Sequence, residues 1–178
     1  MRRILVDTNA YAAFKRGDTQ TRDVFRHAPE IALNATVMGE LLAGFSSGNH
    51  AGRNRRELAE FLASPRVRQL AVDSETAEYY AVLFSGLRKK GRPVPTNDLW
   101  IAASALQHGY AVFSFDKHFG EMENLIMGSQ LDDFLPYDGN WFSVPPHAPH
   151  GQTPRLGVLH PSLMRRAQAA FDAAKRRR

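Results

Sequence analysis

Short apolar runs alternate along the chain with longer segments in which apolar residues recur every three or four positions. The short runs predict strands at residues 3–6, 31–33, 67–72, 111–115 and, more weakly, 124–127. The longer segments predict a helix that ends near residue 14 and further helices over residues 19–27, 36–45, 53–63, 74–90 and 96–108. This order of elements predicts an α/β fold with a central, mainly parallel sheet flanked by helices.

Polar residues stand where several of these helices begin. Their side-chain oxygens can accept hydrogen bonds from the free N–H groups of the first helical turn. Asn34 or Thr36 fits this capping role before the third helix, and Thr96 or Asn97 fits it before the last one. Gly91 follows a basic turn and predicts the end of the helix over residues 74–90.

The composition of the chain changes after about residue 128. Six of the ten prolines and three of the seven histidines lie beyond that point, and the chain ends in four basic residues. Such a composition does not favour a packed core. We therefore expect a folded domain over residues 1–128 and a Pro/His/Arg-rich extension over residues 129–178. This extension is expected to be extended over residues 130–161, to be partly disordered, or to form a short helix near its end.

Composition narrows the classes of protein to which the chain can belong. Its 178 residues are 43% hydrophobic, which suits one folded domain with an appendage. The lack of cysteine excludes disulfides, thiolate zinc sites and cysteine nucleophiles. No apolar stretch approaches the roughly 20 residues of a membrane-spanning helix, so we expect a cytoplasmic protein that contacts no membrane. The net charge of +5 favours an anionic partner such as nucleic acid.

Four carboxylates stand at the edges of apolar segments, where a solvated surface acid is not expected: Asp7, Glu40, Asp98 and Asp116. Asp7 and Asp116 follow strands, so they face one crevice if those strands are neighbours in a parallel sheet. The helices that carry Glu40 and Asp98 can approach the same edge. Gathered carboxylates stay ionised only with a cation, and oxygen ligands without cysteine or histidine suit Mg²⁺ or Mn²⁺.

Three of these acids also fit a purely structural role. Asp7, Asp98 and Asp116 each precede or open a helical pattern and can cap it. Glu40 does not fit this role, because it lies inside an apolar helix, where a buried unpaired charge is strongly unfavourable. His118, two residues after Asp116, is interpreted as structural.

The segments that carry the four acids resemble PIN-domain ribonucleases, and within them the VapC toxins of bacterial and archaeal toxin–antitoxin pairs. They read Ile-Leu-Val-Asp-Thr-Asn at residues 4–9, Thr-Val-Met-Gly-Glu-Leu at 36–41, Pro-Val-Pro-Thr-Asn-Asp-Leu-Trp-Ile-Ala-Ala at 93–103 and Phe-Ser-Phe-Asp-Lys-His-Phe at 113–119. The last two are the more specific, and the resemblance covers about residues 2–128. It implies a PIN-like fold with four catalytic acids, Asp7, Glu40, Asp98 and Asp116. It also implies three supporting polar residues, Thr8, Asn9 and Ser114.

The resemblance further implies an endoribonuclease that depends on Mg²⁺ or Mn²⁺ and leaves 5′-phosphate and 3′-hydroxyl ends. In the expected mechanism Asp7, Asp98 and Asp116 hold a metal ion, directly or through water, and the ion activates a water molecule. Glu40 either orients or deprotonates that water or completes a second, weaker metal site. Expected partners are an RNA substrate, a second copy of the chain in a homodimer, and a cognate antitoxin. Apolar residues of the helices over residues 36–45 and 53–63 fit a groove for the antitoxin, and they fit equally a place in the core or in the homodimer seam. The alternative is a catalytically silent PIN-like module that binds RNA or a protein partner for regulation.

Overall fold

The computed structural model describes residues 1–135, which belong to the first of two units of the chain, Met1–Gly139. The strands are β1 (Ile4–Val6), β2 (Ile31–Asn34), β3 (Val67–Leu70), β4 (Ala111–Phe113) and β5 (Met127–Gly128). The α-helices are α1 (Thr8–Lys15), α2 (Thr19–His27), α3 (Ala35–Ser46), α4 (Ala51–Leu62), α5 (Ser74–Lys90) and α6 (Thr96–His108), and the 3-10 helices are η1 (Lys117–Glu121) and η2 (Leu131–Phe134). None of the helices in this part of the chain is long and apolar enough to span a bilayer.

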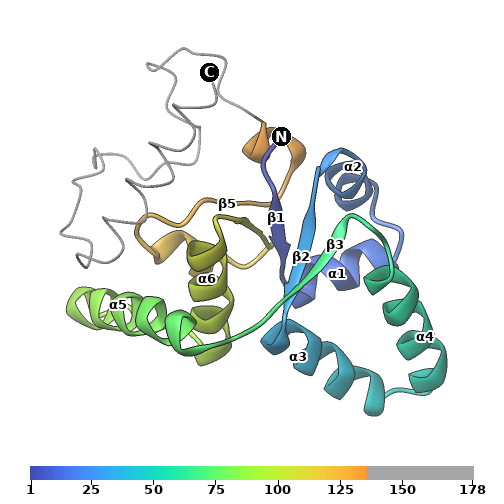
Figure 1. The fold of residues 1–178 in the computed structure, drawn as a ribbon, viewed down its shortest axis with the longest axis horizontal. Helices are drawn as coiled ribbons and strands as arrows, with labels where there is room; N and C mark the ends of the chain where they lie inside the picture. The colour runs from blue at the N-terminus through green and yellow to red at the C-terminus, as the bar shows by residue number, and fades with distance from the viewer. Residues whose placement is uncertain (136–178) are drawn as a thin grey trace. The chain divides into compact units, whose positions relative to one another are not determined.

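The five strands form one sheet in the order β3-β2-β1-β4-β5, and each neighbouring pair is parallel. From β1 the chain runs outward through β2 to β3 and then returns to β4 on the other side of β1. Because parallel crossovers are right-handed, this return places α5 and α6 on the opposite face of the sheet from α1 to α4 (Figure 1). The predicted α/β fold is therefore confirmed, and the gap between the ends of β1 and β4 is where such sheets bind ligands.

Two predicted strands end earlier than expected. The strand expected over residues 111–115 stops at Phe113, because the N–H of Phe115 donates to Asn9 Oδ1 at 3.1 Å instead of extending the sheet. The strand expected over residues 67–72 stops at Leu70. The last strand, expected over residues 124–127, is Met127–Gly128, because Asn124 has a φ of 62°, which does not fit an extended strand.

Asn34 connects the sheet to helices on both of its faces. It caps α3, because its Oδ1 accepts a hydrogen bond from the N–H of Val37 at 3.0 Å. Its Nδ2 donates to Ser104 Oγ in α6 at 2.9 Å, in a fully buried contact. The cap predicted for α6 at Thr96 or Asn97 is wrong: the N-cap is Pro95, which makes no side-chain bond. Asn34 therefore holds α3 and α6 in a fixed relation.

The folded part of the chain continues past residue 128. Residues 131–134 form η2 rather than an extended segment, and the fully buried Phe134 packs edge-on against Phe113 of β4, with ring centroids 5.7 Å apart. The close approach of η2 to β5 requires glycine at position 128, because a Cβ on Gly128 would lie 2.3 Å from Asp133 Cβ. The prediction of an extended tail from residue 130 is thus wrong for η2, and the rest of the predicted extension, residues 136–178, lies outside the described residues.

Replacing Asn34 with alanine should lower the free energy of unfolding by about 2–3 kcal/mol, because the change removes a helix cap and leaves the buried N–H of Val37 without a partner. Urea denaturation measures this change. Asp18→Ala is the matched control, since it removes the exposed cap of α2, which accepts from the N–H of Thr21 at 2.7 Å. The control should cost about 1 kcal/mol. An equal loss in both variants would contradict the connecting role of Asn34.

Candidate active site

Asp7 lies at the carboxyl end of β1, beside the end of β4. The register pairs Val6 with Phe113, so the next residues of the two strands, Asp7 and Ser114, meet at the edge of the sheet. Asp7 Oδ2 accepts a hydrogen bond from Ser114 Oγ at 2.7 Å, and Asp7 Oδ1 accepts from the N–H of Thr8 at 2.7 Å. Asp7 also caps α1, so its structural and site roles coexist in one side chain.

Burial raises the pKa of Asp7 to about 6, against an ordinary value of 3.8. Only 6% of the residue is exposed, and the nearby carboxylates of Asp98 and Glu40 raise its pKa further. The hydrogen bonds from Ser114 and Thr8 act in the opposite direction, because they stabilise the ionised form. The ionised form of Asp7 is therefore disfavoured at this edge of the sheet by burial and by the neighbouring carboxylates.

Ser114 and Asn9 fix the chain that leads from β4 to Asp116. Ser114 Oγ accepts hydrogen bonds from the N–H of Asp116 at 2.9 Å and from Asn9 Nδ2 at 3.1 Å. The same hydroxyl donates to Asp7, so all of its hydrogen-bonding capacity is used. Ser114 is fully buried, and its hydroxyl couples the position of Asp7 to that of Asp116.

Glu40 reaches the same edge from α3 and is held by two donors. Its Oε2 accepts a hydrogen bond from the hydroxyl of Thr8 in α1, and its Oε1 accepts from Asn97 Nδ2 in α6 at 2.6 Å. The side chain is half-buried rather than enclosed. Three helices thus fix the direction in which the Glu40 carboxylate points.

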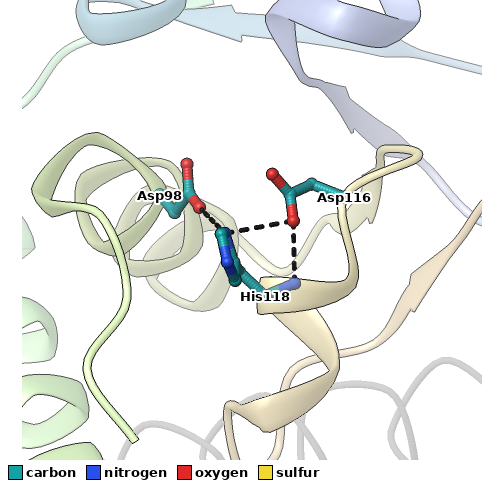
Figure 2. Close-up of side chains that lie close together, drawn as sticks. All are labelled: Asp98, Asp116 and His118. Carbon is teal, nitrogen blue, oxygen red and sulfur yellow. Dashed lines mark hydrogen bonds and ion pairs between the residues drawn. The ribbon is translucent and has the colours of Figure 1, made fainter.

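Asp98 and Asp116 face each other across the ring of His118 (Figure 2). His118 Nδ1 lies 3.2 Å from Asp98 Oδ2 and 3.1 Å from Asp116 Oδ1. Asp116 Oδ1 also accepts from the N–H of His118 at 2.9 Å, so Asp116 caps η1. Asp98 does not cap α6, because it lies in the first turn of that helix, after Thr96 and Asn97.

Like charges accumulate around these side chains. Burial raises the pKa of Asp98, the hydrogen bond from His118 lowers it, and the carboxylates of Asp116 and Glu40 raise it again. Within residues 1–135, no lysine or arginine forms an ion pair with any of the four acids. The site therefore has a deficit of positive charge that a bound cation relieves.

A family model described as the PIN domain matches residues 4–125 of the chain. The chain belongs to the PIN-domain family. Ribonuclease VapC4 of Mycobacterium tuberculosis is 32% identical over 127 residues, which cover 70% of this chain and 95% of the relative. This PIN-domain protein is therefore of the VapC type.

Solved structures agree on the fold of this PIN-domain protein. DNA-bound VapBC from Salmonella typhimurium matches with a TM-score of 0.64 and 22% identity, covering 72% of this chain and 98% of the other. VapBC-5 from Mycobacterium tuberculosis, a member of the VapBC family of toxin-antitoxin systems, matches with a TM-score of 0.58 and 24% identity, covering 72% and 97%. At these identities the likeness supports the PIN fold alone.

The donors of this PIN-domain site fit a divalent cation. Ligand atoms of Asp98, Asp116 and His118 lie within 4.8 Å of one another, so one ion can contact all three. Asp7 is not part of this group. Each of its two oxygens accepts a hydrogen bond, which leaves lone pairs for a contact through water. The carboxylate oxygens of this set suit ions such as Mg²⁺ and Mn²⁺.

The structure brings the sequence-predicted residues of this PIN domain to one edge of the sheet, with Thr8, Asn9 and Ser114 in contact with the acids or with one another. Two further residues belong to the site. His118 was interpreted as structural, and Asn97 was considered only as a cap, yet His118 contacts Asp98 and Asp116, and Asn97 contacts Glu40. Their one sequence signal is that each lies within two residues of a candidate acid.

The raised pKa of Asp7 predicts a pH dependence of stability in the presence of EDTA. Between pH 3.8 and about 6 the folded state keeps a proton that the unfolded state has lost, so the stability of the protein falls as the pH rises through this window. Asp7→Asn cannot titrate and escapes this fall. Relative to the unaltered protein, its free energy of unfolding should therefore gain about 2–3 kcal/mol between pH 4 and 7. Urea titrations at each pH measure the difference.

Asp18→Asn is the control of opposite sign. Hydrogen bonds from Thr21 hold the pKa of Asp18 below its usual range, so the ionised Asp18 stabilises the folded state, and this stabilisation is lost as the pH falls through the folded-state pKa. Relative to the unaltered protein, Asp18→Asn should thus lose stability as the pH rises. The same pH trend in both variants contradicts the assignment for Asp7.

Proposed function

We propose that this protein is a divalent-metal-dependent endoribonuclease and the toxin of a toxin–antitoxin pair, acting in the cytoplasm. The observation that carries the proposal is the meeting of Asp7, Glu40, Asp98 and Asp116 at the carboxyl edge of β1 and β4, in a chain of the family of Ribonuclease VapC4. Such a site hydrolyses RNA phosphodiester bonds and leaves 5′-phosphate and 3′-hydroxyl ends. Its products distinguish it from ribonucleases that form cyclic phosphates.

The residues of the site divide the work. Asp98 and Asp116 present oxygens to the ion, and Asp7 supports the ion from the interior of the site. A Mg²⁺ or Mn²⁺ ion held by these residues would supply positive charge beside the phosphodiester and make a nearby water more acidic. Glu40, held by Thr8 and Asn97, orients the attacking water and takes its proton on a carboxylate oxygen.

Asp98→Asn should reduce cleavage of RNA by about 100-fold or more, because the variant loses a charged oxygen in direct reach of the ion; this loss corresponds to about 2.7 kcal/mol of barrier. End-labelled RNA, incubated with Mg²⁺, Mn²⁺ or EDTA and resolved on denaturing gels, measures the rate. Ligation assays then identify the ends. Asp23→Asn, which changes an exposed acid on α2, is the matched control and should keep full activity.

Cleavage that persists in EDTA, or fragments that end in a 2′,3′-cyclic phosphate, would sink the metal-dependent mechanism. A folded, antitoxin-free protein that cleaves no RNA with either ion would instead favour the silent binding module. Circular dichroism and size-exclusion chromatography on the same samples establish that the protein is folded and unaccompanied.

A hollow between α1, α3 and α4 suits the proposed antitoxin. It has a volume of about 160 Å³ and is lined mainly by apolar groups, from Tyr11, Ala12, Lys15, Leu41, Phe45, Asn54 and Glu57. At its polar end Lys15 Nζ pairs with Glu57 Oε2 at 2.5 Å. An apolar side chain of an antitoxin segment can fill this hollow while a polar group meets the Lys15–Glu57 pair. The sequence led us to expect a groove formed by α3 and α4. The hollow is lined by both of these helices and, in addition, by α1, which was not expected to take part.

Phe45→Ala should weaken antitoxin binding at least tenfold, because it removes an aromatic wall of the hollow. Co-expression with the neighbouring reading frame of the native operon, followed by co-purification and calorimetry, measures the affinity. RNA cleavage should be retained, which separates loss of binding from loss of folding. Ile126→Ala, at an exposed apolar side chain beside β5, should leave the affinity unchanged. Equal affinity in both variants would place the antitoxin elsewhere.

A further inference from the structure

His118 is held in place by the turn that carries it. Its N–H donates to Oδ1 of Asp116, the N-cap of η1, and the next residue, Phe119, is fully buried in the core. The backbone at His118 is therefore anchored on both sides. The ring lies between the carboxylates of Asp98 and Asp116 (Figure 2).

The separations of the donor atoms match those of ligands around one ion. In an octahedral site with bonds of about 2.0–2.1 Å, adjacent ligand atoms lie about 2.9 Å apart and opposite ones about 4.2 Å apart. His118 Nδ1 lies 3.2 Å from Asp98 Oδ2 and 3.1 Å from Asp116 Oδ1, and all the ligand atoms lie within 4.8 Å of one another. Shifts of a few tenths of an ångström bring the three atoms around a common ion.

Asp7, the third ligand expected from the sequence, is less well placed. Its carboxylate lies outside the group of donor atoms that can share one ion, so Asp7 is suited to contact an ion through water rather than directly. Among the described residues, the atoms that can share one ion with Asp98 and Asp116 include an imidazole nitrogen of His118.

We propose that His118 Nδ1, with carboxylate oxygens of Asp98 and Asp116, directly ligates the metal ion, so that the protein binds Mn²⁺ in preference to Mg²⁺. This inference rests on the proposed function for the identity of the site and adds its metal selectivity. The preference follows from ligand chemistry: Mg²⁺ favours oxygen ligands and gives up its water reluctantly, whereas Mn²⁺ suits carboxylates and, as a first-row transition-metal ion, also accepts a nitrogen ligand.

Electron spin-echo envelope modulation of the Mn²⁺-loaded full-length protein tests the nitrogen ligand directly. The unaltered protein should show coupling to one histidine nitrogen, and its pattern should change when histidine is labelled with ¹⁵N. His118→Gln should lose this coupling, because a coordinating glutamine offers oxygen in place of nitrogen. His50→Gln, which changes an exposed histidine at the start of α4, is the matched control and should keep the coupling.

Calorimetric titration with each ion alone supplies the second readout. His118→Gln should raise the Kd for Mn²⁺ about tenfold or more, on the scale seen when the ligand environment of a metal site is altered. The Kd for Mg²⁺ should change less than threefold, so the selectivity ratio should collapse. His118 is half exposed at its side chain, 47%, so the variant should remain folded, and circular dichroism verifies this.

Bound Mn²⁺ without histidine coupling, or a Mn²⁺ to Mg²⁺ affinity ratio that His118→Gln leaves unchanged, overturns the inference and reduces His118 to a hydrogen-bonding partner of the two acids. Protein that binds no Mn²⁺ overturns it as well. These outcomes are independent of the nuclease proposal, which RNA cleavage decides. Histidine coupling without RNA cleavage supports His118 as a metal ligand and contradicts the proposed ribonuclease activity. RNA cleavage without histidine coupling supports the ribonuclease activity and contradicts His118 as a metal ligand.

Discussion

The parallel pairing of β1 with β4 is the constraint on which the site depends. Its register sets Val6 against Phe113, so Asp7 and Ser114 leave the sheet side by side. The position of Asp116 builds on that meeting, because the Ser114 hydroxyl receives the N–H of Asp116 while it donates to Asp7. A shift of one residue in this register would turn these side chains to opposite faces and disperse the site.

The same edge is electrostatically unfavourable without a cation. Burial and neighbouring carboxylates raise the pKa of both Asp7 and Asp98, so part of the folding free energy is used to hold these charges together. Buried hydrogen bonds offset this repulsion, notably those of Asn34, which tie α3 and α6 to β2. The hydrogen-bonded scaffold therefore holds the acids together despite their repulsion, which keeps the geometry ready for an ion.

Capping and site chemistry coincide in two of the acids. Asp7 caps α1 and Asp116 caps η1, so the structural interpretation of each residue is correct and does not compete with a role in the site. A carboxylate oxygen has lone pairs for a backbone N–H and for a further ligand. A helix cap at the end of a parallel strand thus places an acid at the ligand-binding edge and fixes its direction.

The amino-acid sequence by itself determined the α/β class, most element positions and the four acids, because periodicity, strand ends and an acid inside an apolar helix are local signals. Only the tertiary structure decided the strand order, the end of β4 at Phe113 and the inclusion of η2 in the core. It also decided that Asn97 orients Glu40 and that His118 joins Asp98 to Asp116. These contacts join residues 57 and 20 positions apart, and no local pattern specifies which helix lies opposite which turn.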